Sequence, residues 1–320
     1  MKRKLITATV TAVALSLPTA IANAAPDPTT GVELNVSQDQ FVSGKATVNP
    51  GLGRTEGLQA LKDLRVWAWD TNPLFRGYGY ENYPAGTRLQ DVAKKNGITT
   101  KAAYTQIQAD ENLNWIAIQR AFESAKRFAH QRPDGTDGST ATRHGSAPAL
   151  ESLACGTNQT MRSAIFDGFG RREVAALDQN GGNYSNSTGH AIHVLHPTHK
   201  VWGFGQVSIS GSKCENYTAA VNGQSLTKQD TTPSETKVYT LHRAPVTGER
   251  PTGQIQETPK PAPDQGNKPA PTPGQAISSD FSSPTAIAGT IIAALTFLGG
   301  LWAIIQQFLR RILGVVETRF

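Results

Sequence analysis

The chain has 320 residues, of which 38% are hydrophobic and 18% charged, and its formal net charge is +6. Its length allows two domains, but the two most apolar runs lie at the two ends, so only the part between them resembles a globular core. If a signal peptide with the N-terminal basic residues is removed, the net charge of the mature chain falls to about +3. No other stretch concentrates Lys and Arg, so a nucleic-acid partner is not expected.

The N-terminus is typical of a secretory signal. A basic start precedes an apolar run from Leu5 to Ala20, and the small residues Ala22 and Ala24 occupy the two positions that a signal peptidase reads. The run is too short for a transmembrane anchor. We therefore predict a signal peptide over residues 1–24 and export of the remainder.

Two cysteines, Cys155 and Cys214, remain in the exported chain. Outside the cytoplasm such a pair favours a disulfide over two free thiols. It would close a loop of about 60 residues and stabilise the fold by a few kcal/mol, mainly by constraining the unfolded chain.

The first part of the mature chain is polar and then mixed. Residues 25–57 are rich in Thr, Gly, Asp and Pro, and we expect an exposed lead-in. The apolar residues from Leu64 to Trp69 predict a short strand. The turn from Gly77 to Pro84 contains three tyrosines. Tyrosine-rich loops bind sugars in some proteins, but they also cover cores, and the second interpretation is favoured here.

Helical patterns dominate the middle of the chain. Short helices are expected over 88–95, ended by Asn96-Gly97, and over 101–108. Asp110 begins the strongest helix, which ends before Pro133 and close to His130. Its polar face is expected to meet water and carries Gln119, Glu123, Lys126 and Arg127. Another helix is predicted over 161–177, with Glu173 near its middle.

Two further segments carry candidate site residues. Glu151 lies in the apolar stretch 148–156, and a carboxylate there is either at an exposed edge or part of a site. The segment 189–205 reads GHAIHVLHPTHKVWGFG, and its alternating Trp202 and Phe204 predict a strand. His190 would lie just ahead of ordered structure. The later histidines of this segment are expected to be mostly solvated: His193, His196 and His199.

The C-terminal part contains a spacer and an apolar segment. After a last strand over 237–241, prolines recur through 244–283, which predicts an extended linker. Residues 284–308 include about twenty without a charge and predict a transmembrane helix. Arg310 and Arg311 follow, so the tail 309–320 should be cytoplasmic. We expect a single-pass protein of the cell membrane, with its main domain extracellular.

Two histidines and two acids can act chemically in several ways. They can bind a divalent metal such as zinc, pair as general acid and base, or satisfy one another's hydrogen bonds. The chain has no HExxH motif, so its sequence pattern alone is a weak metal signal.

Three segments resemble the CAP superfamily of cysteine-rich secretory, antigen 5 and pathogenesis-related proteins, especially its bacterial members. RAFESAKRFAHQRPDG is similar to the family's first helix and histidine, and ESLACG to its glutamate segment. GHAIHVLHPTHKVWGFG resembles the Gly-His segment that follows. The matches occur in family order over residues 110–209. Two positions depart from the family pattern: Ser152 replaces an Asn, and Phe169 stands where a Trp is common.

The resemblance implies an α/β fold of the three-layer α-β-α sandwich type. By position it makes His130, Glu151, Glu173 and His190 the cleft residues and the candidate catalytic residues. It also makes His130 and His190 the metal ligands for a divalent cation, Zn or Mg. The domain organisation is then 1–24 signal peptide, 25–57 lead-in, 58–243 extracellular domain, 244–283 linker, 284–308 transmembrane helix and 309–320 cytoplasmic tail.

Three functions remain open at this point. The first is a cell-surface domain whose cleft binds a ligand or cation of the cell envelope or the extracellular space. The second is a metal-assisted extracellular hydrolase of peptidase type, in which a histidine activates water. The third is an envelope cysteine peptidase with Cys155 as its nucleophile, which requires a free thiol.

Overall fold

A computed structural model describes residues 24–252 of the chain. The predicted transmembrane helix (284–308), the cytoplasmic tail, most of the linker and all but the last residue of the signal peptide lie outside these residues. Within the described part, no helix combines the length and apolar character needed to cross a bilayer.

The described residues form a mixed α/β fold, which confirms the predicted fold class at that level. A six-stranded sheet has the order β3-β5-β4-β1-β6, and the two-residue β2 pairs with β4 beside it. All pairings are antiparallel except that of β2 with β4. The strands are β1 (Val42–Val48), β2 (Gln108–Ala109), β3 (Leu150–Gly156), β4 (Val201–Ser208), β5 (Asn216–Gly223) and β6 (Lys237–Arg243).

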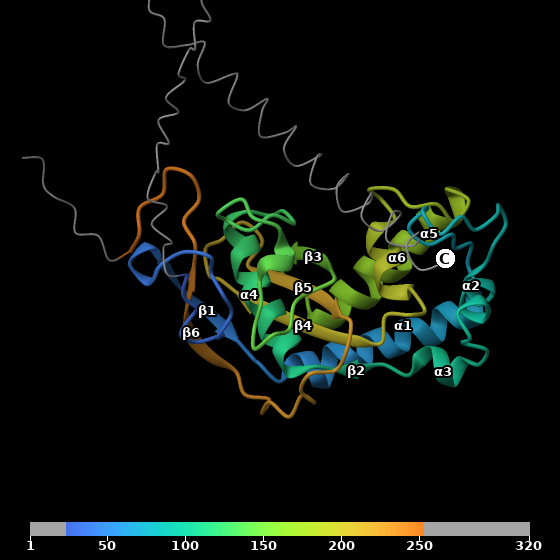
Figure 1. The fold of residues 1–320 in the computed structure, drawn as a ribbon, viewed down its shortest axis with the longest axis horizontal. Helices are drawn as coiled ribbons and strands as arrows, with labels where there is room; N and C mark the ends of the chain where they lie inside the picture. Colours follow the sequence, from blue (N-terminus) through green and yellow to red (C-terminus); the bar gives the residue numbers. More distant parts are fainter. Residues whose placement is uncertain (1–23, 253–320) are drawn as a thin grey trace, which may run out of the picture. The chain divides into compact units, whose positions relative to one another are not determined.

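Helices cover both faces of this sheet (Figure 1). Two of them begin in π-helical turns: η2 (Gly53–Gly57) leads into α1, and η4 (Ser163–Arg172) leads into α5. The α-helices are α1 (Leu58–Thr71), α2 (Leu89–Lys95), α3 (Lys101–Thr105), α4 (Glu111–Lys126), α5 (Glu173–Gln179) and α6 (Gly189–Leu195).

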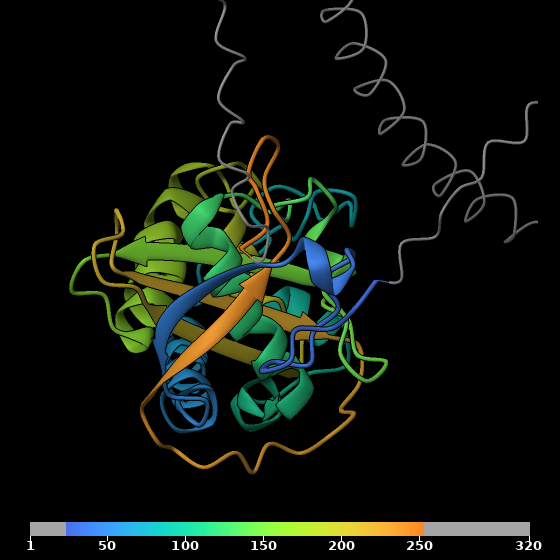
Figure 2. The same cartoon turned by 90° about the vertical axis from the view of Figure 1, so that its left-hand side faces the viewer.

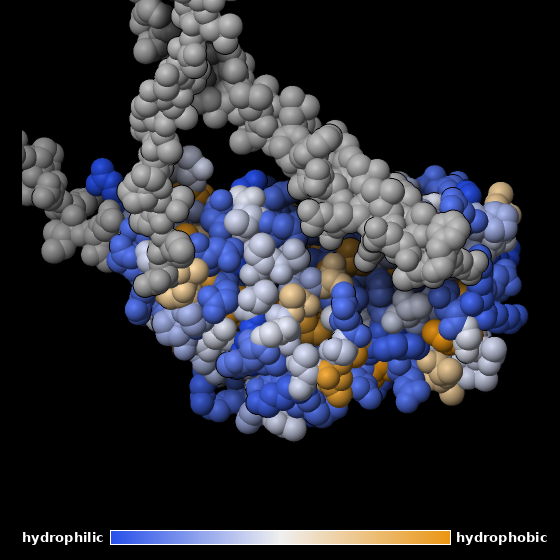
Figure 3. Space-filling model, in the orientation of Figure 1, coloured by the Kyte–Doolittle hydropathy of each residue, from blue (hydrophilic) through white to orange (hydrophobic). Residues whose placement is uncertain are grey.

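The alternation of side chains along the central strands divides the core in two. On one face, Trp202 and Phe204 of β4 pack in a cluster with residues of α1, α5 and α6. On the other face, Val201 and Val207 pack in a cluster with α4. The β1–β6 ribbon, which runs across the view in Figure 2, contributes Val48 and Leu241 to this second cluster. Apolar side chains are therefore concentrated inside, and the face visible in Figure 3 is mainly hydrophilic.

Helix α4 lies unusually close to β4 because two strand positions are glycine. A Cβ atom on Gly203 would be 2.1 Å from the backbone carbon of Leu113, and one on Gly205 would be 2.2 Å from the backbone nitrogen of Ile118. Both obstacles are helix backbone, which cannot rotate away. These glycines therefore set the distance between α4, which ends just before His130, and the sheet.

Replacement of Gly205 by Ala is expected to lower the free energy of unfolding by about 1–3 kcal/mol, since overpacking forces α4 off the sheet. Chemical denaturation measures the change. Gly168→Ala is the control, because its added Cβ would meet only Ser163 O at 3.5 Å and helix propensity favours Ala. Equal stability of Gly205→Ala and the wild type would contradict the role given to this glycine.

Two predictions for the N-terminal part are wrong. The segment 25–57 is not an exposed lead-in, because it contains β1 and because Val32 and Leu34 are fully buried. The residues from Leu64 to Trp69 belong to helix α1 and not to a strand. Local β-propensity suggested a strand, but Leu61, Leu64 and Ala68 recur at helical spacing and are completely buried.

The helix predicted from Asp110 is confirmed, but its polar face does not meet water. The side chain of Asp110 caps it by accepting a hydrogen bond from Leu113 N at 3.0 Å. Gln119 and Glu123 are 0% and 1% exposed. The apolar spacing located the helix correctly, whereas the burial of its polar face depends on partners that come from other parts of the chain.

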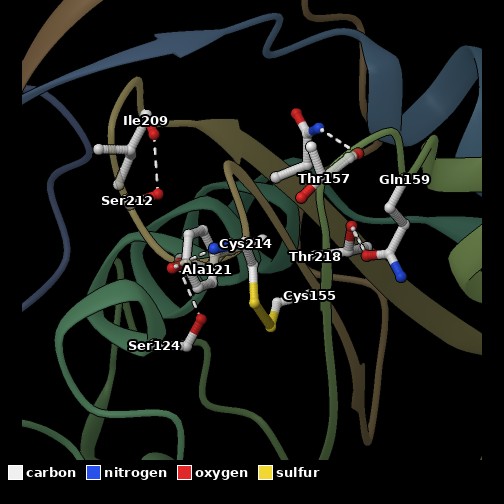
Figure 4. The surroundings of a disulfide bond; sticks show 11 residues. Ala121, Ser124, Cys155, Thr157, Gln159, Ile209, Ser212, Cys214 and Thr218 are labelled. Atoms are coloured by element: carbon white, nitrogen blue, oxygen red, sulfur yellow. Dashed lines mark hydrogen bonds between the residues drawn. A yellow bond between two sulfur atoms is a disulfide. The ribbon is translucent and has the colours of Figure 1, made fainter.

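The predicted disulfide is present. Cys155 of β3 is bonded to Cys214, which precedes β5, with 5.5 Å between their Cα atoms. Figure 4 shows the bond beside Ala121 and Ser124 of α4, where Ser124 Oγ donates to Ala121 O. The bond links two segments separated by 59 positions. It therefore constrains the unfolded chain strongly.

Candidate functional site

His130, Glu151 and His190, which are distant in sequence, line one cleft of about 610 Å³. His130 lies in the loop after α4, Glu151 in β3, and His190 in the first turn of α6. Glu173, the fourth predicted residue, begins α5 and bonds to His190. The fold thus brings together all four residues that the sequence analysis singled out.

The first histidine is oriented by the first acid. His130 Nδ1 lies 3.1 Å from Glu151 Oε1, and the side chain of His130 is 61% exposed whereas that of Glu151 is 7% exposed. The hydrogen bond to Glu151 raises the pKa of His130 above its usual value. With Nδ1–H directed at the carboxylate, the neutral imidazole has its lone pair on Nε2.

Glu151 is itself held by a buried arginine. Arg120 of α4 donates from Nε to Glu151 Oε2 at 2.6 Å and from Nη2 to Glu151 Oε1 at 3.1 Å. Such a bidentate pair is strong and directional. Arg120 Nη2 also donates to the carbonyl oxygens of Ala129 and His130, so the same side chain positions the loop that carries the histidine.

A second acid balances this arginine inside the protein. Glu123 accepts hydrogen bonds from Arg120 Nη1 and Arg132 Nη2, both at 2.6 Å, and all three side chains are at most 1% exposed. Burial alone would raise the pKa of Glu123, but the two guanidinium groups hold it below its usual value. Glu123 and Glu151 therefore share the buried positive charge of Arg120. We call these three residues and Arg132 the arginine network.

The second histidine has an acid of its own. His190 Nδ1 lies 2.7 Å from Glu173 Oε1, and the backbone N–H of Ala191 donates to Glu173 Oε2 at 3.0 Å. The ring of Phe169 packs against the imidazole with 4.8 Å between centroids. Both oxygens of Glu173 are thus used to orient α6 and its histidine, and His190 Nε2 has no hydrogen-bond partner among the described residues.

The site therefore contains two imidazoles of the same kind. In each, a carboxylate accepts from Nδ1–H and Nε2 remains available to bind a proton, a cation or a ligand. Neither glutamate is free to act as an independent base, because its oxygens already accept bonds from the protein. Across residues 24–252, no three His, Cys, Asp or Glu side chains are grouped so that they could hold a metal ion.

A third imidazole in the cleft is already occupied. His193 lines the cleft, but Ser152 Oγ lies 2.7 Å from its Nδ1 and Asn222 Oδ1 lies 2.9 Å from its Nε2. The serine hydroxyl donates to Nδ1 and Nε2–H donates to the amide oxygen, which keeps the ring neutral. Ser152 thus fixes the tautomer of His193.

The prediction that His193, His196 and His199 are mostly solvated is wrong. His193 and His196 are 3% and 6% exposed, and His199 is half-buried. His190 and His193 lie in helix α6, and not in an extended segment, so their spacing of three places them on neighbouring helical positions. His196 then pairs with Glu81 at 3.0 Å, a partner that the local pattern does not indicate.

Sequence reasoning also missed Arg120 and His193. Arg120 sits within RAFESAKRFAHQRPDG, and its place one turn before Glu123 on a helix was a visible signal for an ion pair. The disulfide has a further consequence for function, because Cys155 has no free thiol and the cysteine-peptidase interpretation lacks its nucleophile.

Comparison of the chain with protein-family models, with curated proteins and with solved structures found no match.

Proposed function

We propose that the protein is an exported domain of CAP type whose His130/His190 cleft binds a ligand or a divalent cation at the cell envelope. The observation that carries this proposal is the pair of imidazoles in one cleft, each oriented by a carboxylate at Nδ1. The order of the three similar segments supports the family, and helices on both faces of the sheet agree with an α-β-α sandwich.

We also propose that the protein is attached to the cell membrane. The apolar residues 284–308 would anchor the chain in a single pass, with the domain outside the cell and the tail 309–320 inside. The proline-rich linker would then act as a spacer between the domain and the bilayer. An extracellular ligand would therefore have access to the cleft.

A divalent cation would be held by Nε2 of His130 and Nε2 of His190. Imidazole nitrogens suit zinc, and the carboxylates Glu151 and Glu173, which accept from Nδ1–H of the two rings, strengthen them as ligands. Two protein ligands leave the other coordination positions to water or to a bound molecule. The cation would supply Lewis acidity there, while the protein's own residues fix the tautomers of both histidines.

A metal-assisted hydrolase is the second candidate. The geometry that favours it is the short bond of 2.7 Å between His190 and Glu173, since an imidazole oriented by a carboxylate can accept a proton from water at Nε2. No serine or cysteine nucleophile belongs to the four cleft residues, so water would be the nucleophile. Binding without turnover is the proposal preferred here.

Zinc titration of the purified protein by calorimetry tests the cleft. His130→Ala and His190→Ala are each expected to lower zinc affinity at least about tenfold, and Glu173→Gln to have a smaller effect in the same direction. His144→Ala, which removes an exposed histidine that does not line the cleft, is the matched control and should leave binding unchanged. Wild-type affinity in both cleft variants would refute cation binding at this site.

Casein and peptidoglycan, with added zinc or magnesium, separate the two candidates. No cleavage of either substrate, together with altered zinc binding in His130→Ala, supports a binding protein. Measurable hydrolysis that both histidine variants abolish while they remain folded would make the protein an enzyme.

A further inference from the structure

A row of tyrosines borders the cleft. Tyr78 and Tyr184 both line it, with 6.1 Å between their ring centroids. Tyr80 extends this row, because its ring stacks on that of Tyr78 with centroids 5.9 Å apart. Tyr184 is 51% exposed and Tyr80 is 75% exposed. The three rings, which we call the tyrosine row, therefore lead from the cleft wall to solvent.

Contacts with Glu81 and His196 hold Tyr78 in place. Glu81 accepts a hydrogen bond from Tyr78 N at 2.9 Å and pairs through its other oxygen with His196 Nε2 at 3.0 Å. The ring of Tyr78 also stacks on that of His196, with 5.5 Å between centroids. A ligand that contacted Tyr78 would not have to order this side chain first, which favours binding.

Large side chains are exposed elsewhere around the same cleft. Phe128, just after α4, is 54% exposed, and Leu150, at the start of β3, is 39% exposed. Both line the cleft with Tyr184. Aromatic and aliphatic surface gathered at a concave site is typical of a binding surface, whereas isolated exposed residues are not informative.

Hydrogen-bonding groups share the cleft with these rings. Asp137, Ser139, Ser185 and Asn186 all line it, and they offer both donors and acceptors. Partial burial raises the pKa of Asp137, but hydrogen bonds from Ser139 and the nearby Arg120 and His130 lower it overall, so its carboxylate is an acceptor at neutral pH. The hydroxyl of Tyr78 is buried and has no hydrogen-bond partner among the described residues.

From this combination we propose that the cleft binds an oligosaccharide whose sugar rings lie against the exposed aromatic side chains of the cleft, Tyr184 and Phe128. A pyranose presents an apolar C–H face, which suits the electron-rich face of an aromatic ring, and hydroxyl groups at its edge, which suit the polar lining. Tyr184 and Phe128 are available for such contacts, whereas Tyr78 already stacks on Tyr80 and His196. An acyl chain fits poorly, because it would cover Asp137 and Glu151 with hydrocarbon. This inference rests on the proposed function, since it names the ligand class of the same cleft.

The test uses the full chain in a detergent without a sugar headgroup and measures binding by calorimetry. The probes are four tetrasaccharides: chitotetraose, cellotetraose, xylotetraose and mannotetraose. At least one is expected to bind with a Kd below about 1 mM. Absence of heat from all four at about 10 mM overturns the proposal.

Variants then locate the binding. Tyr184→Ala is expected to lower the affinity for the tetrasaccharide that binds by at least about tenfold. Tyr184→Phe keeps the ring, and its affinity should stay within about threefold of the wild type. Phe128→Ala is a second exposed position that should weaken binding without affecting folding. Leu226→Ala is the control, because Leu226 is equally exposed to Leu150 at 39% and does not line the cleft. Unchanged affinity in both aromatic variants overturns the proposal.

Zinc titration of the same samples keeps the two proposals distinguishable. Zinc binding that depends on His130 and His190, without any saccharide binding, refutes the ligand class and leaves the cleft as a cation site. Saccharide binding that depends on Tyr184, without zinc binding, supports the ligand class and refutes the cation. If neither binds, both proposals fail.

Discussion

Acidification from pH 6.5 to pH 4.5 is expected to lower the free energy of unfolding by up to about 5 kcal/mol through His193 and His199, which the fold keeps neutral. Burial, with smaller contributions from neighbouring positive groups, lowers the pKa of His193 to about 3 and that of His199 to about 2. Both imidazoles therefore stay neutral in the folded protein over this range, whereas in the unfolded chain they bind protons below about pH 6.5.

The surroundings of these rings explain why protonation is so unfavourable. The ring centroids of His196 and His199 are 4.6 Å apart, and those of His193 and His199 are 5.6 Å apart. The fully buried Arg65 donates to the carbonyl oxygens of His196 and His199, so a permanent positive charge already lies beside the cluster. His130 and His190 face His193 from the cleft, and Glu81 is an acid in direct contact with the cluster through His196.

The sign follows from proton linkage. Because the unfolded state binds more protons than the folded state below pH 6.5, stability is complete above that pH and is lost as the pH falls. Each histidine contributes up to about 2.7 kcal/mol over two pH units. Urea denaturation at a series of pH values measures the effect.

A single substitution distinguishes the contribution of this histidine cluster to the pH dependence of stability from that of the other titrating groups. His199→Gln is expected to reduce the slope of stability against pH by up to about 1.4 kcal/mol per pH unit between pH 6 and pH 4.5. His144→Gln, at an exposed position, should leave the slope unchanged. An identical slope in His199→Gln and the wild type would show that His199 is not kept neutral by the fold.

Glu123→Ala is expected to destabilise the protein by about 3–5 kcal/mol, because it removes one partner from a buried ion network. Arg120 and Arg132 would remain inside at 0% and 1% exposure, and Arg132 would lose its carboxylate. Chemical denaturation of the variant at neutral pH measures the loss.

Two further variants interpret that loss. Glu235→Ala breaks the ion pair between Glu235 and Lys237, both of whose side chains are more than half exposed. This variant should have an unchanged free energy of unfolding. Arg132→Met in the Glu123→Ala background is expected to recover part of the stability, since it removes one uncompensated charge. A cost of less than about 1 kcal/mol for Glu123→Ala would mean that water reaches the network and that Arg120 is not a rigid support for Glu151.

The sequence alone supported the predictions that depend on local pattern or on composition. The spacing of apolar residues after Asp110 located α4, and the alternation of Trp202 and Phe204 located β4. The exported context of two cysteines predicted their bond. The expected resemblance to a family selected the residues of the cleft, and periodicity could not have done so, because their positions in the chain range from 130 to 190.

Predictions failed where partners from distant segments decide burial. Trp67 and Trp69 have high β-propensity, yet the core that α1 covers favours a helix there. Glu123 and His196 were expected in water, but Arg132 and Glu81 satisfy them inside the protein. A polar residue on a helix is exposed or buried according to such partners, and its own sequence neighbourhood does not reveal them.

The sequence by itself determined which chemical groups this protein has, since two histidines and two glutamates can be named from their segments. Only the tertiary structure decided how those groups are used. Arg120 and Ala191 occupy the oxygens of Glu151 and Glu173, so the acids orient imidazoles and leave Nε2 of His130 and His190 available. The reason is physical: a carboxylate acts as a base, a ligand or a support according to the donors within hydrogen-bond distance, and those donors are brought together only by folding.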